Sequence, residues 1–274
     1  MLLAFSHIEK TGGTTLIQVL RRNFFFRFID VRPLHRASAG AFADADLRHY
    51  RRLNPWVHAI AGHAVQPHAR FARSNEHVRF LTILRNPARR YVSQFLYFVR
   101  KGYFPPNFES WLESPQYMNL QTKKIAGSED VDAAYSLLSG MFAVGMLEEF
   151  DAFLLRLADA LKPASFDPCY IVRNAGTVQV CKVTELLQQY QAKIDSRNEK
   201  DFELFERVTN QLIPDRNASY TGDLSADLVE FAVRNSVFSL GFRDYADFAL
   251  RKLYYEPMSS LIRLKNGLQA TGSY

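Results

Sequence analysis

The chain has few cysteines, and that scarcity excludes one class of protein. Its 274 residues include 2 cysteines, Cys169 and Cys181, which is too few for a disulfide-stabilised scaffold. They flank residues 170–180, which we predict as a β-hairpin that turns at residues 174–176. Two reduced, partly buried thiols are the favoured interpretation, and a bond across the hairpin is the alternative. The Cys and His spacing of a zinc site is also missing, and we expect no metal.

Long hydrophobic runs, internal repeats and low-complexity segments are missing too. No apolar run approaches the roughly 20 residues that cross a bilayer, so we expect no membrane span. The predicted first strand begins at Leu2, which leaves no room for a secretory signal peptide. We therefore expect a soluble, cytoplasmic protein. A luminal domain excised from a membrane protein is the alternative.

Basic residues outnumber acidic residues, but they are spread along the whole sequence. Lys and Arg number 34 against 28 Asp and Glu, which gives a net charge of +6. The basic residues are scattered rather than gathered in one tract, so we expect no nucleic-acid partner. The excess suits an anionic cofactor or an acidic glycan, although many soluble proteins are basic without binding either.

The order of predicted elements indicates the fold class. Apolar, β-branched runs alternate with amphipathic stretches, which predicts an α/β fold with a parallel sheet flanked by helices on both faces. The predicted strands are 2–8, 57–61, 78–84 and 141–145, and the predicted helices among them are 14–24, 87–101, 107–126, 129–139 and 147–161. The C-terminal half is predicted to be rich in helices, at 184–193, 197–212 and 225–236.

We interpret residues 1–274 as one domain, with a core over about 2–212 and a helical C-terminal extension over about 213–274. The residues after Tyr255 show little periodicity, and we expect them to pack loosely. The aromatic run 24–28 is interpreted as a helix end entering the next buried strand rather than as a stacking surface for bases.

A phosphate-binding loop is predicted at the end of the first strand. Residues 5–16 read Phe-Ser-His-Ile-Glu-Lys-Thr-Gly-Gly-Thr-Thr-Leu, and an amphipathic helix follows at once. Backbone N–H groups, glycines without Cβ, a lysine and hydroxyls therefore meet at a helix N-terminus, where anions bind. The lysine precedes the glycines, unlike the ATPase loop Gly-x-x-x-x-Gly-Lys-Ser/Thr. The candidate ligands are Lys10, Thr11, Gly12, Gly13, Thr14 and Thr15.

A second anion site is predicted after the strand 78–84. Arg85 ends that strand, Asn86 and Pro87 begin a helix, and Ser93 follows beside its apolar stripe. Arg85 and Ser93 together are candidates for holding another phosphate. Two phosphate sites on one sheet edge indicate a nucleotide that is phosphorylated at both ends of its ribose.

These two motifs resemble those of the sulfotransferases that use 3′-phosphoadenosine 5′-phosphosulfate (PAPS), and most closely the carbohydrate branch with the heparan-sulfate 2-O and 6-O enzymes. Residues 7–16 are similar to the family's 5′-phosphosulfate loop, and residues 84–93 (Leu-Arg-Asn-Pro-Ala-Arg-Arg-Tyr-Val-Ser) to its 3′-phosphate motif. Weaker matches follow in the family's order, at residues 119–122, 144–148 and 198–204. The resemblance spans about residues 2–210 and implies a P-loop-type fold. Glu9 departs from it, because proline is commonest there, and we expect the Glu9 side chain to face away from the anion site, toward the lysine or the acceptor.

The resemblance implies transfer of a sulfuryl group from PAPS to an acceptor hydroxyl, with 3′-phosphoadenosine 5′-phosphate (PAP) as product. The acceptor that it favours is a saccharide. Lys10 would stabilise the leaving phosphate. His63 follows Gly62 at the end of a predicted strand, where sites form in parallel sheets, and matches the family's catalytic base. The transferred group carries less charge than a phosphoryl group, so the chemistry does not demand a divalent metal.

Several residues are weaker candidates. His7 is a structural or second site residue, and Glu148 is either a site residue or a first-turn carboxylate favoured by the helix dipole. The acceptor contacts proposed for the cleft are Gln121, Lys123 and Lys124, for which a solvated helix face is the alternative.

Two other functions stay open. A P-loop kinase or other NTPase predicts magnesium-dependent ATP turnover, against which the misplaced lysine and the arginine at the end of strand 78–84 both count. A non-catalytic protein that binds a nucleotide or polyanion would bind PAP and transfer nothing. The sequence leaves the acceptor, its sulfated position and the oligomeric state undetermined.

Overall fold

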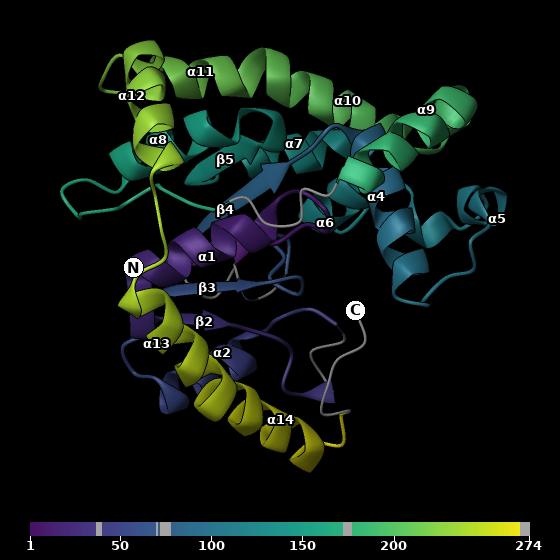
Figure 1. The fold of residues 1–274 in the computed structure, drawn as a ribbon. Helices are drawn as coiled ribbons and strands as arrows, with labels where there is room; N and C mark the ends of the chain where they lie inside the picture. The colour runs from purple at the N-terminus through teal and green to yellow at the C-terminus, as the bar shows by residue number, and fades with distance from the viewer. Residues whose placement is uncertain (37–39, 70, 72–77, 172–176, 269–274) are drawn as a thin grey trace.

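The computed structural model of the chain describes residues 1–36, 40–69, 71, 78–171 and 177–268. Five strands form one sheet in the order β2-β3-β1-β4-β5, and every neighbouring pair is parallel (Figure 1). The strands are β1 (Leu2–Ser6), β2 (Phe28–Asp30), β3 (Ala59–Gly62), β4 (Val78–Leu84) and β5 (Ala143–Met146). The predicted α/β class is therefore confirmed.

Helices connect the strands and make up most of the C-terminal half. Those between the strands are α1 (Gly13–Phe24), α2 (Asp44–Leu53), α4 (Pro87–Arg100), α5 (Phe108–Leu112), α6 (Leu120–Ala126) and α7 (Val131–Ser139). After the sheet come α8 (Phe150–Ala160), α9 (Thr177–Arg197), α10 (Glu199–Arg207), α11 (Ile213–Ala218), α12 (Leu224–Ser236), α13 (Phe242–Leu250) and α14 (Glu256–Lys265). A π-helical turn joins α10 to α11, and another joins α13 to α14.

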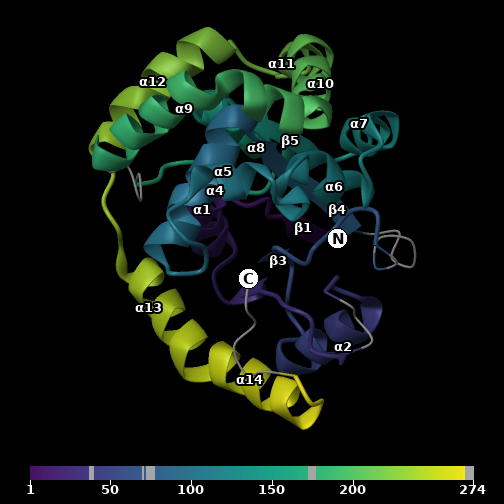
Figure 2. The same cartoon turned by 90° about the vertical axis from the view of Figure 1, so that its right-hand side faces the viewer.

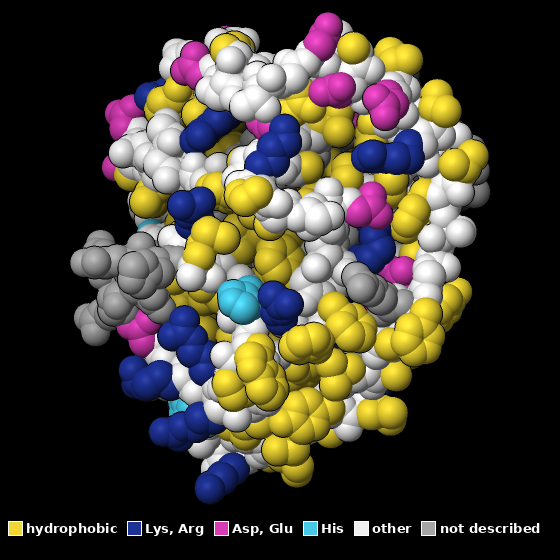
Figure 3. Space-filling model, turned by 90° about the vertical axis from the view of Figure 1, so that its left-hand side faces the viewer, with side chains coloured by type: hydrophobic (Ala, Val, Ile, Leu, Met, Phe, Trp, Pro, Cys, Tyr) yellow, Lys and Arg dark blue, Asp and Glu magenta, His cyan; other side chains and the backbone are white. Residues whose placement is uncertain are grey.

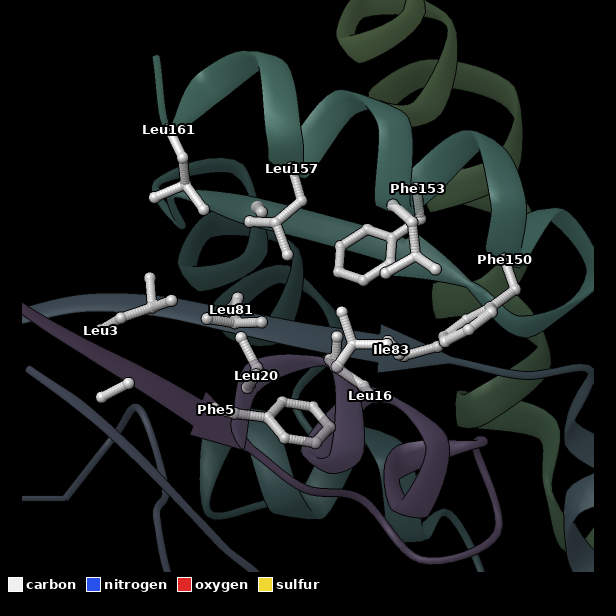
Figure 4. Close-up of a cluster of buried hydrophobic side chains, with 14 of the residues drawn as sticks. Leu3, Phe5, Leu16, Leu20, Leu81, Ile83, Phe150, Phe153, Leu157 and Leu161 are labelled. Atoms are coloured by element: carbon white, nitrogen blue, oxygen red, sulfur yellow. The ribbon is translucent and has the colours of Figure 1, made fainter. Parts of the chain in front are cut away.

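One face of the sheet is covered by α1 and α8. Side chains alternate across a strand, so Leu3 and Phe5 of β1 point to this face beside Leu81 and Ile83 of β4. Figure 4 shows these side chains meeting the apolar side of α8 and two leucines of α1. The α8 residues in the contact are Phe150, Phe153, Leu154 and Leu157. This packing fixes the start of α1 against the end of β1.

The opposite face is covered in two parts. Leu2 and Ala4 of β1 pack with Ile60 of β3 against α2, whose buried residues include Leu47 and Tyr50. Beside them, the β4–β5 half of the sheet packs against α6, α7, α10 and the π-helical turn after α10. Its contacts include Leu84, Val144, Ile125, Leu138 and Leu204.

An aromatic cluster joins α4, α5 and α9. Tyr91 and Phe95 of α4 surround Trp111 of α5, and the Tyr91 hydroxyl donates to the Trp111 carbonyl at 2.9 Å. The α9 residues that pack here recur at helical spacing: Val183, Leu186, Leu187, Tyr190 and Ile194. This contact orients the helix that carries Ser93.

Three predictions about local structure are wrong. The predicted hairpin strand over 177–180 is the first turn of α9, since the apolar side of α9 packs on α4 and overrides the strand preference of its β-branched residues. The predicted turn at 174–176 lies outside the described residues. Residues 107–126 form not one helix but α5, a short turn at Pro115–Tyr117 and α6, because Asn107 caps α5 and Pro115 cannot continue it.

The third wrong prediction concerns the C-terminus, where residues after Tyr255 form the helix α14. Its Ser259 and Arg263 are buried, and Arg263 donates to the Pro33 carbonyl. Figures 1 and 2 both show α13 and α14 running past α2 at the β2 edge of the sheet. Figure 3 shows hydrophobic side chains gathered in this lower half of the molecule. Large apolar side chains exposed here include Phe26, Trp56, Phe242, Phe248 and Leu253.

Cys169 is buried and free, as predicted. Burial is the main cause that raises the pKa of its thiol, and the neighbouring Asp167 acts in the same direction. The side chain of Cys181 lies outside the described part of the structure.

Within the described ranges, no helix combines the length and apolar character needed to cross a bilayer.

Candidate functional site

The predicted site residues lie at the carboxyl ends of β1, β3 and β4. The two strands that follow β1 in the chain, β2 and β3, lie on one side of it in the sheet. The next two, β4 and β5, lie on its other side. The strand order therefore reverses beside β1. In open parallel sheets, ligands bind in the crevice outside the strand ends at such a switch point.

The loop after β1 makes a tight turn into α1. Lys10 and Gly12 have positive φ values of 68° and 82°, and Gly12 directly precedes α1. A Cβ on Gly12 would lie 2.6 Å from Leu147 Cδ1, so a larger residue would displace the leucine as well as strain the positive φ. Thr11 is buried and its hydroxyl donates to the Ile8 carbonyl at 2.9 Å, which commits that side chain to the loop itself.

The start of α1 opens onto the cleft. Thr14 is exposed and Thr15 half-buried, and both line the cleft with Gly12 and Gly13. Because the first N–H groups of a helix have no partner within it, this end presents donors and a positive dipole. α1 has no acidic residue in its first turn that would neutralise this end.

Lys10 is a desolvated cation without a carboxylate partner among the described residues. Its Nζ lies 4.7 Å from the centre of the Tyr97 ring on α4. Burial lowers the pKa of Lys10 to about 8, and the nearby positive charges of Arg85 and Arg100 act in the same direction. An anion bound beside this ammonium would offset both the cost of its burial and the repulsion from the two arginines.

Arg85 joins the second motif to the first. It follows β4 directly, and its Nη1 donates to the Lys10 carbonyl at 2.9 Å. Its backbone is clamped by Gln121, whose amide accepts from the Arg85 N–H and donates to the Arg85 carbonyl, both at 2.9 Å. Burial holds the pKa of Arg85 below its usual range, opposed by the charge of Glu148. Glu148 also accepts the Asn86 N–H at 2.9 Å.

Ser93 lies one helical turn and a half beyond the start of α4. Its side chain is 5% exposed and lines the cleft. No described residue makes a hydrogen bond with its hydroxyl. Tyr97, four residues on and therefore on the same side of α4, also lines the cleft.

His63 follows β3 and faces the loop after β1. Its Nδ1 lies 2.8 Å from the His7 carbonyl, which can only accept, so Nδ1 carries the proton and the neutral ring keeps its lone pair on Nε2. The His7 and His63 rings stack with centroids 4.0 Å apart. Burial lowers the pKa of His63, Glu9 opposes that shift, and Lys124 adds to it. Burial also holds the pKa of His7 well below its ordinary value, with the charge of His63 adding to the shift.

The Glu9 carboxylate lies beside Lys124 and His63. One carboxylate oxygen, Oε1, lies 3.1 Å from Lys124 Nζ and 3.5 Å from His63 Nδ1. Lys124 of α6 also donates to the His63 carbonyl at 3.1 Å. Its neighbour Lys123 instead bonds the Pro115 carbonyl and pairs with Glu129, so it does not line the cleft.

A buried network holds α6, and therefore Gln121, against α10. Asp201, which is fully buried, accepts the N–H groups of Gln121 and Thr122 and the Thr122 hydroxyl, at 2.8–3.1 Å. The buried Arg90 lies 3.9 Å from the same carboxylate. The weak motif matches at residues 119–122 and 198–204 thus form one structural unit, which supports Arg85 from behind.

These groups share one cleft of about 1890 Å³. Of the predicted site residues, all but Thr11 line it: Lys10, Gly12, Gly13, Thr14, Thr15, His63, Arg85 and Ser93. Sequence reasoning missed Tyr97, for which the spacing from Ser93 was an available signal. It also missed the wall of the cleft formed by Asp30, Arg32 and the C-terminal helices. The sequence contains no signal from which that wall could have been predicted.

The described residues contain no group of three or more His, Cys, Asp or Glu side chains that could hold a metal ion. The expected independence of metal stays a prediction. Comparison of the sequence with protein-family models and with curated proteins found no match.

Proposed function

We propose that the chain is a sulfotransferase that moves a sulfuryl group from PAPS to an acceptor hydroxyl, with a saccharide as the acceptor. The observation that carries the proposal is the hydrogen bond from the Arg85 guanidinium to the Lys10 carbonyl. It joins the loop expected to bind the 5′-phosphosulfate to the strand end expected to bind the 3′-phosphate. One nucleotide phosphorylated at both ends can therefore meet both sites.

The residues present fit such a donor. Lys10 is a desolvated cation without a described counter-charge, the start of α1 offers free N–H groups, and Ser93 adds a hydroxyl in the same cleft. Two anionic groups would compensate Lys10 and Arg85, whose burial is otherwise unfavourable. The cations and donors are fixed before the ligand arrives, which is the arrangement that stabilises developing charge.

Each residue then has a role in the transfer. His63 Nε2 accepts the proton of the acceptor hydroxyl as the oxygen attacks sulfur; a general base of this kind contributes roughly 10²- to 10⁴-fold. The bond between sulfur and the bridging oxygen breaks, and Lys10 stabilises the charge that this oxygen gains. The N–H groups at the start of α1 hold the 5′-phosphate, while Arg85 and Ser93 hold the 3′-phosphate.

Calorimetry with PAP against ATP and magnesium tests the donor. We expect PAP to bind and ATP to bind at least a hundredfold more weakly, and Arg85→Ala to reduce the affinity for PAP. The exposed Lys182→Ala serves as a control that leaves it unchanged. Equal binding of both nucleotides, with magnesium-dependent ATP hydrolysis, would instead establish the NTPase function.

Turnover tests the catalytic roles. Lys10→Ala and His63→Ala are each expected to reduce sulfate transfer at least a hundredfold without loss of the fold. His58→Ala is the matched control, since that histidine is exposed and does not line the cleft. If the wild-type protein binds PAP but transfers sulfate to no acceptor in a saccharide screen, the non-catalytic function is correct.

A further inference from the structure

We propose that Glu9, held by Lys124, is a positioning residue for His63 that orients its ring and stabilises the imidazolium formed when His63 accepts a proton. This inference rests on the proposed function, in which His63 is the base. Nothing in the two phosphate motifs requires an acid at residue 9, since Glu9 touches neither Arg85 nor the start of α1. Its contacts are with the histidine side of the cleft.

The geometry makes Glu9 a second acceptor for the His63 Nδ1–H. That group donates to the His7 carbonyl at 2.8 Å, and Glu9 Oε1 lies 3.5 Å from the same nitrogen. Both acceptors lie on the Nδ1 side of the ring, so a ring flip, which would place Cδ2 where Nδ1 lies, would remove both contacts. The ring also stacks on His7, and Lys124 holds the His63 backbone through its carbonyl. His63 lines the cleft.

The charge on Glu9 is incompletely balanced in the absence of a protonated histidine. Oε1 has Lys124 at 3.1 Å, whereas the buried Oε2 has no hydrogen-bond partner among the described residues. The side chains of Glu9, Lys124 and His63 are 22%, 19% and 25% exposed, so water screens their charges only in part. A positive charge that forms on His63 during proton transfer is therefore favoured by Glu9.

The opposing charge is Lys124. It lies beside Glu9 and bonds the His63 backbone, so it disfavours a second positive charge nearby. His7, which stacks on His63, is the other titratable group facing the ring, and its lowered pKa keeps it neutral. Glu9 therefore raises the pKa of His63, whereas Lys124 lowers it. Removing the two charges one at a time should shift that pKa in opposite directions.

An NMR titration of the His63 ring tests this directly and requires no enzymatic activity. The resonance is assigned by its loss in His63→Ala. Glu9→Gln should lower the pKa of His63 by about 1 to 2 pH units, because an opposite charge at this distance is removed. Lys124→Gln should raise it. The exposed Glu109→Gln, on α5, should change nothing.

Kinetics supply the second readout. In Glu9→Gln, the acidic limb of kcat/KM should move to lower pH by the same amount as the NMR titration, and the plateau should fall more than tenfold. Glu9→Asp should recover part of both. A merely structural role would lower the plateau and leave the acidic limb in place.

The proposal is overturned if the pKa of His63 in Glu9→Gln stays within 0.3 unit of wild type, or if Lys124→Gln lowers it. Should Glu9→Gln fail to fold, the direction of the Lys124→Gln shift decides alone. If the titrations shift as expected and no sulfate transfer is found, the pairing is correct and the proposed function is not.

Discussion

Replacing Gly13 with alanine tests how precisely the two histidines are fixed. Gly13 is the first residue of α1, and a Cβ built on it would lie 2.1 Å from the His7 ring. Ordinary contact begins at 3.4 Å, so the ring must withdraw by about 1.3 Å. His7 in turn stacks on His63 with ring centroids 4.0 Å apart, so a displacement of the His7 ring changes that contact.

The expected effect on stability is modest. Overpacking of this kind costs about 1–3 kcal/mol, and the better helix propensity of alanine returns up to about 1 kcal/mol. A net loss of about 1–2 kcal/mol lowers Tm by about 2–8 °C in a chain of this size. The effect on catalysis is larger, because displacing a catalytic group by about 1 Å reduces the rate roughly a hundredfold.

A thermal melt and a sulfate-transfer assay on the same preparation check both numbers. Gly140→Ala is the matched control, because its nearest neighbours would lie at an ordinary 3.7 Å. We expect that control to keep wild-type turnover. A Gly13→Ala protein with unchanged Tm and turnover within threefold of wild type would refute the tight packing of His7 between Gly13 and His63.

Four further predictions concern charged residues in and behind the site. Arg85→Ala should weaken PAP binding about 10- to 100-fold in calorimetry, the range for lost hydrogen bonds to a charged group. PAP affinity should fall above pH 8 as Lys10, with its pKa of about 8, loses its proton, and Lys10→Arg should abolish that fall. Because the pKa of Lys10 is about 8 in the folded state and 10.5 in an unperturbed lysine, the same group should make the unliganded fold more stable as the pH rises between these values. Asp201→Asn should cost about 3–5 kcal/mol by removing the negative charge beside the buried Arg90, which a thermal melt will show as a fall in Tm of about 6–20 °C.

The parts of the fold predicted best were those coded by short, continuous patterns. The strand 78–84 was placed to the residue, since its run of β-branched and apolar side chains is bounded by Arg85 and by Pro87. The loop from Lys10 to Thr15 was recognisable because anion binding at a helix start needs glycine, hydroxyl and cation within one turn. Both motifs were expected to meet, and the bond between Arg85 and Lys10 brings them together.

The parts that the sequence could not predict depend on contacts between distant segments. Nothing at residue 9 indicates that Glu9 meets Lys124, which lies 115 residues away and reaches it only because α6 packs beside the β1 loop. The strand-like residues 177–180 become helical through the packing of α9 on α4. The helix α14 is held by hydrogen bonds such as the one from Arg263 to the Pro33 carbonyl. Such long-range bonds cannot be predicted from the local periodicity of the sequence.

The two walls of the cleft are built from different parts of the chain. The groups that would hold the donor follow strands whose order the backbone fixes, and Gln121 and Asp201 brace them from behind. The opposite wall comes from Arg32 and from α13 and α14, joined by contacts such as Arg32 to Ser259. For the proposed reaction, we therefore expect donor binding to tolerate substitutions in α13 and α14, and acceptor binding to be sensitive to them. Substitutions there should change KM for the acceptor while leaving PAP affinity intact, and acceptor selectivity is the property least accessible from short motifs.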